Sequence, residues 1–358
     1  MYSMAKLNEG DVMEGVFAIA LAQLFAYDRI DKGKLNQIRA QIEPKMFQTG
    51  RYETIVRRFS EGNPRDNIEV RLIVRLKYQS TMDAFGPNFE VLLEKASDVG
   101  NIGRKIDTLV AYTNLKYREK IRRIRNAYLK NNVSDDVAIT VTADGIAGET
   151  SGGEIKGDLD VDVVINGQSY LDERLNFSMK SGSKTLANLS PFNGMMDILR
   201  RFGIQLKDEE KYRKILGEVL ATARTSKEKK LKVQTIRELY SDVQRGLSKL
   251  SSTPQLKTAA FQLFRDVAFG SDLADVVDVD KTKVKEMTVE SINELEKNTQ
   301  SVEISAPPTG GNIKFVVNPL NEVLFQLRFK NRSSEVNGEF NIKELKFYVE
   351  AGKAAYAS

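Results

Sequence analysis

The stretch from Lys156 to Lys180 constrains the fold more than any other, because its apolar and polar residues alternate with a period of two. Such alternation predicts a strand with one buried face and one open face. The apolar positions of this strand are Leu159, Val161 and Val163. The opposite face carries three aspartates, Asp158, Asp160 and Asp162.

Asn166-Gly167 follows this strand and is a strong signal for a tight hairpin turn. We therefore expect a second strand, from Leu175 to Lys180, to return beside the first. Three aspartates on one strand face repel one another, and aspartate is depleted in strands. That face is either fully solvated or occupied by a cation, and a hard divalent ion such as Mg²⁺ prefers oxygen ligands of this kind.

The composition excludes several kinds of chemistry. The chain has 358 residues, enough for a large core, and contains no cysteine and no histidine. Disulfides, thiolate zinc sites, thiol nucleophiles, the Ser-His-Asp triad and histidine-based zinc catalysis are therefore excluded. Any catalysis has to use Asp, Glu, Lys, Ser, Tyr and metal ions. A formal charge of +5 permits a nucleic-acid partner without requiring one.

Neither a signal peptide nor a membrane span is expected. Residues 1–10 lack a basic region followed by an apolar run, and no segment has the uninterrupted apolar length that crosses a bilayer. We expect a soluble, cytoplasmic protein.

Residues 8–27 are predicted to form the first helix, with Asn8 as its cap and an apolar stripe that includes Phe17 and Leu21. Glu14 lies on or beside the apolar face. Two interpretations stand: a glutamate at the edge of the stripe that reaches water, or a carboxylate directed at a metal site.

A long helix is predicted from Ile102 to Leu129, with a strongly basic second half. Runs of charge are usually a solvated face, but charge of one sign on a helix with tyrosines also fits a helix that contacts phosphates. Both interpretations stand. The candidate phosphate contacts on this helix are Arg122, Arg123 and Arg125.

The other elements are assigned by the same patterns. Strands are predicted at 69–78, 137–141, 313–317 and 322–330, residues 342–350 fit strand or helix, and residues 191–202 fit a helix. Residues 207–300 are predicted to be an all-helical insertion, because they are highly charged and carry helical apolar stripes. The loop from Ser181 to Lys184 is small, flexible and basic, so Lys184 is a further candidate phosphate contact.

Lys156-Gly157-Asp158 on one strand and Ser178-Met179-Lys180, followed by Ser181-Gly182-Ser183, on the next resemble the phage-type members of the PD-(D/E)xK, restriction-endonuclease-like nuclease superfamily. The opening with Glu14 and the closing residues Tyr348–Lys353 are similar to both ends of such proteins. The resemblance does not extend to residues 207–300. It departs from the superfamily pattern at Ser178, where an acidic residue is expected.

The resemblance implies an α/β, restriction-endonuclease-like fold with a mixed β-sheet flanked by helices and a helical insertion. The expected domains are a core at 1–206, the insertion at 207–300, and C-terminal strands at 301–358 that complete the core. One mixed sheet would contain residues 137–180 and 313–330, flanked by the helices at 8–27 and after 191.

The implied activity is Mg²⁺-dependent (or Mn²⁺-dependent) hydrolysis of DNA phosphodiester bonds by a phage-encoded enzyme in the host cytoplasm. The expected catalytic residues are Glu14, Asp158, Asp160 and Lys180, and the candidate metal ligands are Glu14, Asp158, Asp160 and Asp162. Glu14 would replace the missing acid, and the choice between Asp158 and the other two aspartates stays open. Lys180 would position the attacking water or offset charge on the phosphate. Arg328 is a further candidate phosphate contact.

Two alternatives to an active nuclease remain open at this point. Ser178 equally suits a catalytically inactive nuclease-like module that binds DNA or serves in virion assembly. A Ca²⁺-binding structural protein would use the aspartate face, although no EF-hand spacing supports it. A nuclease that cuts both strands is often a dimer, so a homodimer is compatible with the resemblance.

Overall fold

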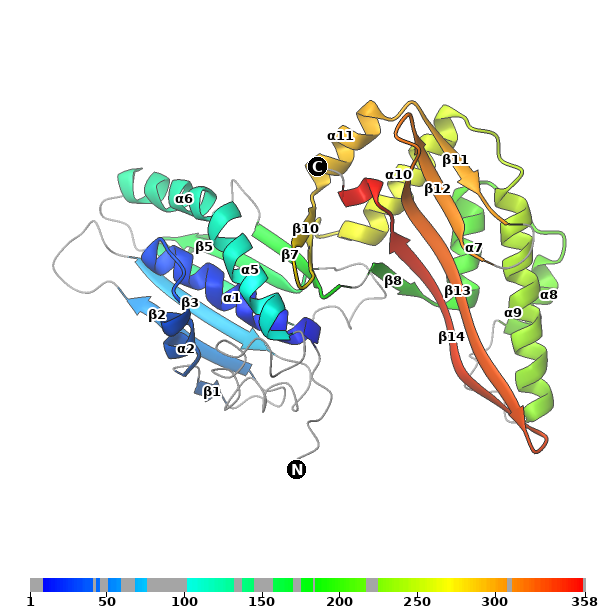
Figure 1. Cartoon of the computed structure of the whole chain (residues 1–358), viewed down its shortest axis with the longest axis horizontal. Coiled ribbons are helices and arrows are strands. Elements are labelled where there is room, and N and C mark those ends of the chain that lie inside the picture. Colours follow the sequence, from blue (N-terminus) through cyan, green and yellow to red (C-terminus); the bar gives the residue numbers. More distant parts are fainter. Residues whose placement is uncertain are drawn as a thin grey trace. The chain divides into compact units, whose positions relative to one another are not determined.

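Segments with period-two alternation form strands, and segments with long apolar stripes form helices. The structure, a computed structural model, divides the chain into two compact units. The first unit contains residues 1–183 and 269–288, and the second contains 184–268 and 289–358. The structure describes residues 9–40, 43–45, 51–58, 68–75, 102–131, 137–144, 157–169, 175–182, 184–216, 225–307 and 311–356. Figure 1 colours the elements of both units along the chain, from blue at the N-terminus to red at the C-terminus.

A mixed sheet forms the centre of the first unit. Its described strands are β1 (Glu43–Lys45), β2 (Arg51–Arg58), β3 (Ile68–Arg75), β4 (Val137–Asp144), β5 (Leu159–Ile165), β6 (Gln168–Ser169), β7 (Leu175–Lys180), β9 (Asp275–Val279) and β10 (Val284–Met287). They follow the order β1-β2-β3-β4-β5-β7-β9-β10, with β6 paired to β5. The pairs β3–β4 and β7–β9 are parallel, and the other pairs are antiparallel.

The aspartate hairpin forms as predicted. Asn166 and Gly167 have φ values of 51° and 79°, the positive values that a tight hairpin turn requires at both central residues. Leu159, Val161 and Val163 are buried, whereas Asp160 on the other face is exposed. β7 then pairs with the first half of β5, where Leu159 lies opposite Phe177.

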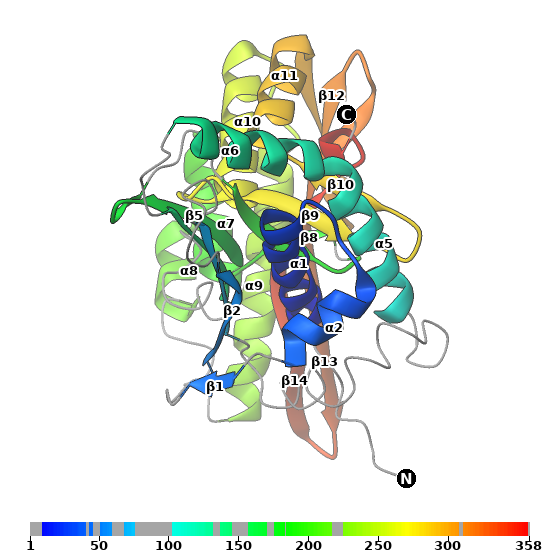
Figure 2. The same cartoon turned by 90° about the vertical axis from the view of Figure 1, so that its left-hand side faces the viewer.

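Helix α1 (Glu9–Tyr27) is the element around which the first core is built. The predicted helix at 8–27 is confirmed within one residue, and the side chains from Val12 to Phe25 are almost all buried. A helix that is apolar on all sides is expected to be covered on all sides. It packs against β3 and β4 and against α5 (Ile102–Lys116), which lies beside it in Figure 2. Helix α2 (Lys32–Ala40) follows it.

The predicted long helix at 102–129 is divided at Tyr117 into α5 and α6 (Arg118–Asn131). The Tyr117 ring packs against Phe17 and Phe177, at centroid distances of 5.8 and 5.4 Å. Its hydroxyl donates a hydrogen bond to Glu286 on β10. The side chain at the division is therefore anchored in the core of the first unit.

The second unit is built on an antiparallel sheet in the order β11-β12-β13-β14-β8. Its strands are β8 (Thr185–Leu189), β11 (Ser301–Ser305), β12 (Ile313–Asn318), β13 (Glu322–Val336) and β14 (Glu339–Ala351). Its helices are α7 (Pro191–Arg201), α8 (Glu209–Leu216), α9 (Ser226–Leu247), α10 (Pro254–Phe269), α11 (Val289–Asn298) and the short 3₁₀ helix η4 (Ala354–Tyr356). Helices α7 and α9 pack on β14, and α9 runs along β13 and β14 in Figure 1.

Two predictions about the architecture are wrong. Residues 313–330 do not join the sheet of residues 137–180, because they belong to the second sheet with β8 and β14. The block 207–300 is not all helical, since it contains β9 and β10, and β9 pairs with β7 in the first sheet. The boundaries at 206 and 300 therefore differ from the two units, and the helix after 191 flanks the second sheet.

The physical reason is that periodicity identifies a strand and its buried face but carries no information about which sheet the strand joins. Mixed α/β architecture, with a mixed sheet flanked by helices, is confirmed. In the part of the chain that the structure describes, no helix combines the length and the apolar character needed to cross a membrane.

Candidate functional site

Asp158, Ser178 and Lys180 form a hydrogen-bonded group where β5 begins and β7 ends. The Asp158 Oδ2 atom accepts hydrogen bonds from Ser178 Oγ at 3.1 Å and from the Met179 backbone N–H at 2.8 Å. Lys180 Nζ donates to Ser178 Oγ at 2.9 Å. The Ser178 hydroxyl therefore bridges a carboxylate and an ammonium group on adjacent strands.

The alternation of β7 places these side chains on one face. Phe177 and Met179 belong to the apolar core around α1, and the Phe17 and Phe177 rings lie 5.1 Å apart. Successive strand residues point to opposite faces, so Ser178 and Lys180 point away from α1. Ser178 is only 1% exposed, so its hydroxyl is fixed inside the protein.

The residues after Lys180 are held from two sides. Lys105 on α5 is buried, and its Nζ donates to Glu9 Oε2 at 2.7 Å, to Ser181 Oγ at 2.9 Å and to the Ser181 carbonyl at 3.2 Å. The Gly182 backbone N–H donates to Asp278 Oδ1 at 2.8 Å. Gly182 has φ of +71°, which glycine adopts without strain. These contacts fix the position where the chain leaves β7.

Asp278 lies on β9 directly opposite Lys180 in the parallel register, and it is buried. Burial raises the pKa of its carboxyl, and the Gly182 hydrogen bond and the charges of Lys285 and Lys105 oppose this effect. Asp278 is absent from the predicted site residues because it lies in the block predicted to be helical. Asp275-Val-Val-Asp-Val279 is a β-branched run that would have indicated a strand.

The three aspartates of the hairpin do not act as one cluster. Asp160 is exposed and lies opposite Asn176, and Asp162 accepts a hydrogen bond from Ser169 Oγ at 2.5 Å. At about 3.3 Å per strand residue, Asp162 lies about 13 Å along the strand from Asp158, too far to share one ion. Across the described ranges, no three Asp or Glu side chains form a group that could hold a metal ion.

Glu14 is 6% exposed, so it does not reach water at the edge of a stripe. On the same helix, Phe17 contacts Phe177, and Glu9 accepts a hydrogen bond from Ser181 Oγ at 3.3 Å. Glu14 lies between these two residues along α1 and hence on the α1 side of the sheet, whereas Ser178 and Lys180 point away from α1.

The candidate phosphate contacts are distributed over both units. Arg122 and Arg123 are exposed on α6, where Arg122 Nη1 lies 3.3 Å from Glu119 Oε1, and Arg125 belongs to the same helix. Lys184 is exposed at the start of the second unit. Arg328 on β13 pairs with Glu350 at 2.5 Å, and its guanidinium lies 5.0 Å from the centre of the Tyr348 ring.

Comparisons with protein-family models, with curated proteins and with solved structures give no match to this chain.

Proposed function

We propose that the first unit is a restriction-endonuclease-like, metal-dependent phosphodiesterase that cleaves DNA, with its catalytic centre at Asp158 and Lys180. The observation that supports this proposal is the bridge of Asp158, Ser178 and Lys180 across β5 and β7. It places a carboxylate and an ammonium group together, as metal-assisted phosphodiester hydrolysis requires.

The donor set around the bridge fits a hard divalent cation, because it consists of carboxylate and hydroxyl oxygens. Mg²⁺ is commonly held by one or two carboxylates together with water and substrate phosphates, so a cage of three acids is unnecessary. Asp158 would hold the ion together with water and substrate phosphate oxygens. Glu14 lies on the α1 side of the sheet, whereas Ser178 and Lys180 point away from α1, so Glu14 is not assigned to this centre. When bound, Mg²⁺ or Mn²⁺ polarises the phosphate and lowers the pKa of a bound water.

The protein's own residues have separate roles in this proposal. The Lys180 ammonium offsets the negative charge that develops on the phosphate during hydrolysis. Ser178 positions both Lys180 and Asp158 through its buried hydroxyl. Lys105 and Asp278 hold Ser181 and Gly182, and thereby the end of the strand that carries Lys180.

The test is cleavage of supercoiled and linear DNA in Mg²⁺, Mn²⁺ or EDTA. Wild type should cleave only with a divalent metal ion. Lys180→Ala and Asp158→Asn should each lower the rate by about 100-fold or more, the cost of removing one electrostatic stabiliser from an active site. Glu14→Gln should keep most of the activity, and a loss as large as that of Asp158→Asn in a folded variant would show that Glu14 reaches the ion.

Lys297→Ala is the matched control, because this exposed lysine lies in the second unit, outside the proposed centre. It should cleave at the wild-type rate. Thermal unfolding of every variant separates lost chemistry from lost folding. Metal-dependent cleavage by Lys180→Ala at the wild-type rate would refute the proposed catalytic role.

Ser178 favours a second candidate function, because it occupies the position where the nuclease superfamily has an acidic residue. In that case the unit is an inactive nuclease-like module that binds DNA or takes part in virion assembly. Absence of cleavage by folded wild-type protein with either metal ion, with DNA binding retained, would support this second candidate.

A further inference from the structure

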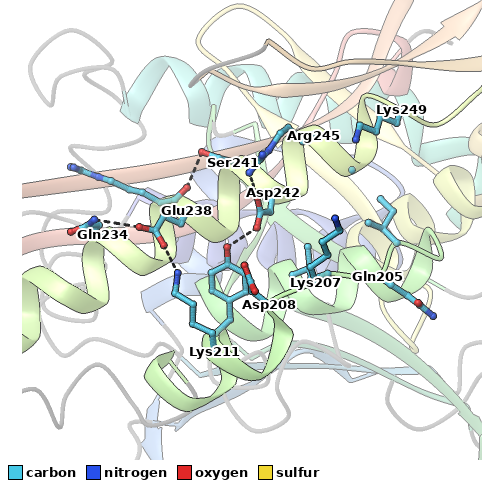
Figure 3. Close-up of a pocket in the computed structure, with 15 residues that line it drawn as sticks. Gln205, Lys207, Asp208, Lys211, Gln234, Glu238, Ser241, Asp242, Arg245 and Lys249 are labelled. Carbon is cyan, nitrogen blue, oxygen red and sulfur yellow. Dashed lines mark hydrogen bonds and ion pairs between the residues drawn. The ribbon is translucent and has the colours of Figure 1, made fainter.

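A polar groove lies in the second unit between α8, the loop that precedes it, and α9. Its volume is about 780 Å³. Gly246 allows the loop to approach α9, because a Cβ atom at this position would lie 2.7 Å from Ile204 Cγ2. The charged residues that line the groove are Lys207, Asp208, Lys211, Arg237, Glu238, Asp242, Arg245 and Lys249 (Figure 3).

Two of the three carboxylates in the groove, Glu238 and Asp242, form ion pairs with basic residues that also line the groove. Lys211 Nζ lies 3.0 Å from Glu238 Oε2, and Arg245 pairs with Asp242. The Tyr212 hydroxyl also donates to Asp242 Oδ2 at 2.6 Å. Figure 3 shows these contacts gathered around Glu238 and Asp242.

Three exposed cations remain, namely Lys207, Arg237 and Lys249. Within the described ranges, their side chains form no ion pair at 4.0 Å or less, and Asp208 is the groove carboxylate left to oppose them. The groove therefore has an excess of positive charge that an anionic ligand would neutralise.

The cations are spread along the groove and are not focused on one point. Arg237 lies ten residues before Leu247, the last residue of α9, or about 15 Å at 1.5 Å per residue, and Lys249 lies beyond the end of this helix. That length matches roughly four phosphates at 3.4 Å of rise along one DNA strand. The Tyr212 ring is buried, so it does not offer a stacking surface for a base.

We propose that this groove binds the phosphate backbone of DNA, with Lys207, Arg237 and Lys249 as the phosphate contacts. The inference rests on the proposed function for the choice of DNA as the polyanion. It assigns the second unit a role in holding the substrate, and the contacts are independent of base sequence because they reach phosphates alone.

The test measures DNA affinity without cleavage, by fluorescence anisotropy of a labelled duplex with the full-length chain in EDTA. The groove variant is the triple substitution Lys207→Gln, Arg237→Gln and Lys249→Gln. The control carries the same charge change at Lys297, Lys314 and Lys343, which are exposed in the same unit outside the groove. Thermal unfolding checks that both variants fold.

The groove variant should bind on the order of tenfold more weakly at low salt. Its log–log salt dependence should be shallower by up to about 2.7, because each lost phosphate contact removes about 0.9 from the slope. The control should keep the wild-type slope. Equal weakening of both variants, an unchanged groove variant, or no DNA binding by wild type would each overturn the inference.

The two proposals fail in different assays. Wild type that binds DNA through the groove but cleaves nothing refutes the nuclease and leaves the groove standing. Cleavage that depends on Lys180, combined with a groove variant of unchanged affinity, refutes the groove alone.

Discussion

At the scale of single residues, the bridge of Asp158, Ser178 and Lys180 contrasts with the neighbouring carboxyl of Asp278. Asp158 accepts hydrogen bonds from Ser178 Oγ at 3.1 Å and from the Met179 N–H at 2.8 Å, whereas Asp278 is buried and faces a backbone N–H donor at 2.8 Å. Burying a carboxylate is costly unless partners compensate for the lost hydration. For Asp278 the cost of burial is the larger effect, since the pKa of its carboxyl is raised from the usual 3.8.

This raised pKa has a defined sign for stability. Between the unfolded and the higher folded pKa of Asp278, the folded chain binds more protons than the unfolded chain. The stabilisation of the folded chain by the protonated Asp278 carboxyl is therefore complete at low pH. It is lost as the pH rises through the pKa of Asp278 in the folded state.

Asp278→Asn removes this titration, while an amide oxygen can still accept the Gly182 hydrogen bond. The variant should have a higher free energy of unfolding than wild type at neutral pH, and a flatter dependence on pH above about 4. Urea unfolding at several pH values measures both quantities. Lower stability of the variant at neutral pH would contradict the prediction.

At the scale of elements, the junction of α5 and α6 links these helices to the sheet. The Tyr117 hydroxyl donates to Glu286 on β10, and Lys116 Nζ lies 3.2 Å from the other oxygen of the same carboxylate. Tyr117 is buried at this junction, so its hydrogen bond to a charged group is shielded from water.

Tyr117→Phe keeps the ring contacts with Phe17 and Phe177 but removes this hydrogen bond. The free energy of unfolding should fall by about 2 kcal/mol, the typical value for a hydrogen bond to a charged partner. Tyr348→Phe is the contrast, because Tyr348 is only half-buried and its hydrogen bond to Glu344 is less shielded from water. It should cost less than about 1 kcal/mol, and equal losses in chemical denaturation would refute the distinction.

At the scale of the whole molecule, each unit has its own sheet and its own buried aromatic side chains. Phe177 belongs to the core around α1, whereas Phe325 stacks on Phe315 at 4.2 Å in the second unit. The chain passes between the units after residues 183, 268 and 288, so neither unit is a continuous segment.

We predict that replacing a buried aromatic side chain by alanine destabilises mainly the unit that contains it. Phe325→Ala and Phe177→Ala should each cost about 3–5 kcal/mol, as expected for a fully buried phenylalanine. Hydrogen exchange followed by mass spectrometry should show faster exchange in β11–β14 for the first variant and in β4–β7 for the second. Uniform acceleration across both sheets in either variant would show that the two cores unfold together.

Local elements could be predicted from the sequence because their signals are local. The alternation of residues 159–165, the Asn166-Gly167 turn and the apolar helix from 9 to 27 depend on side-chain spacing within a few residues. The strands predicted at 313–317 and 322–330 by the same pattern are confirmed as β12 and β13, although they were assigned to the wrong sheet.

The sequence by itself therefore determined which side chains share a strand face, including the placement of Ser178 and Lys180 opposite the core face of β7. Tertiary structure alone decided that β9 pairs with β7, which brings Asp278 beside Lys180, and that Asp158 rather than Asp162 meets Ser178. The reason is physical: alternation sets the direction of a side chain, whereas pairing between distant strands depends on how separate apolar faces are buried together.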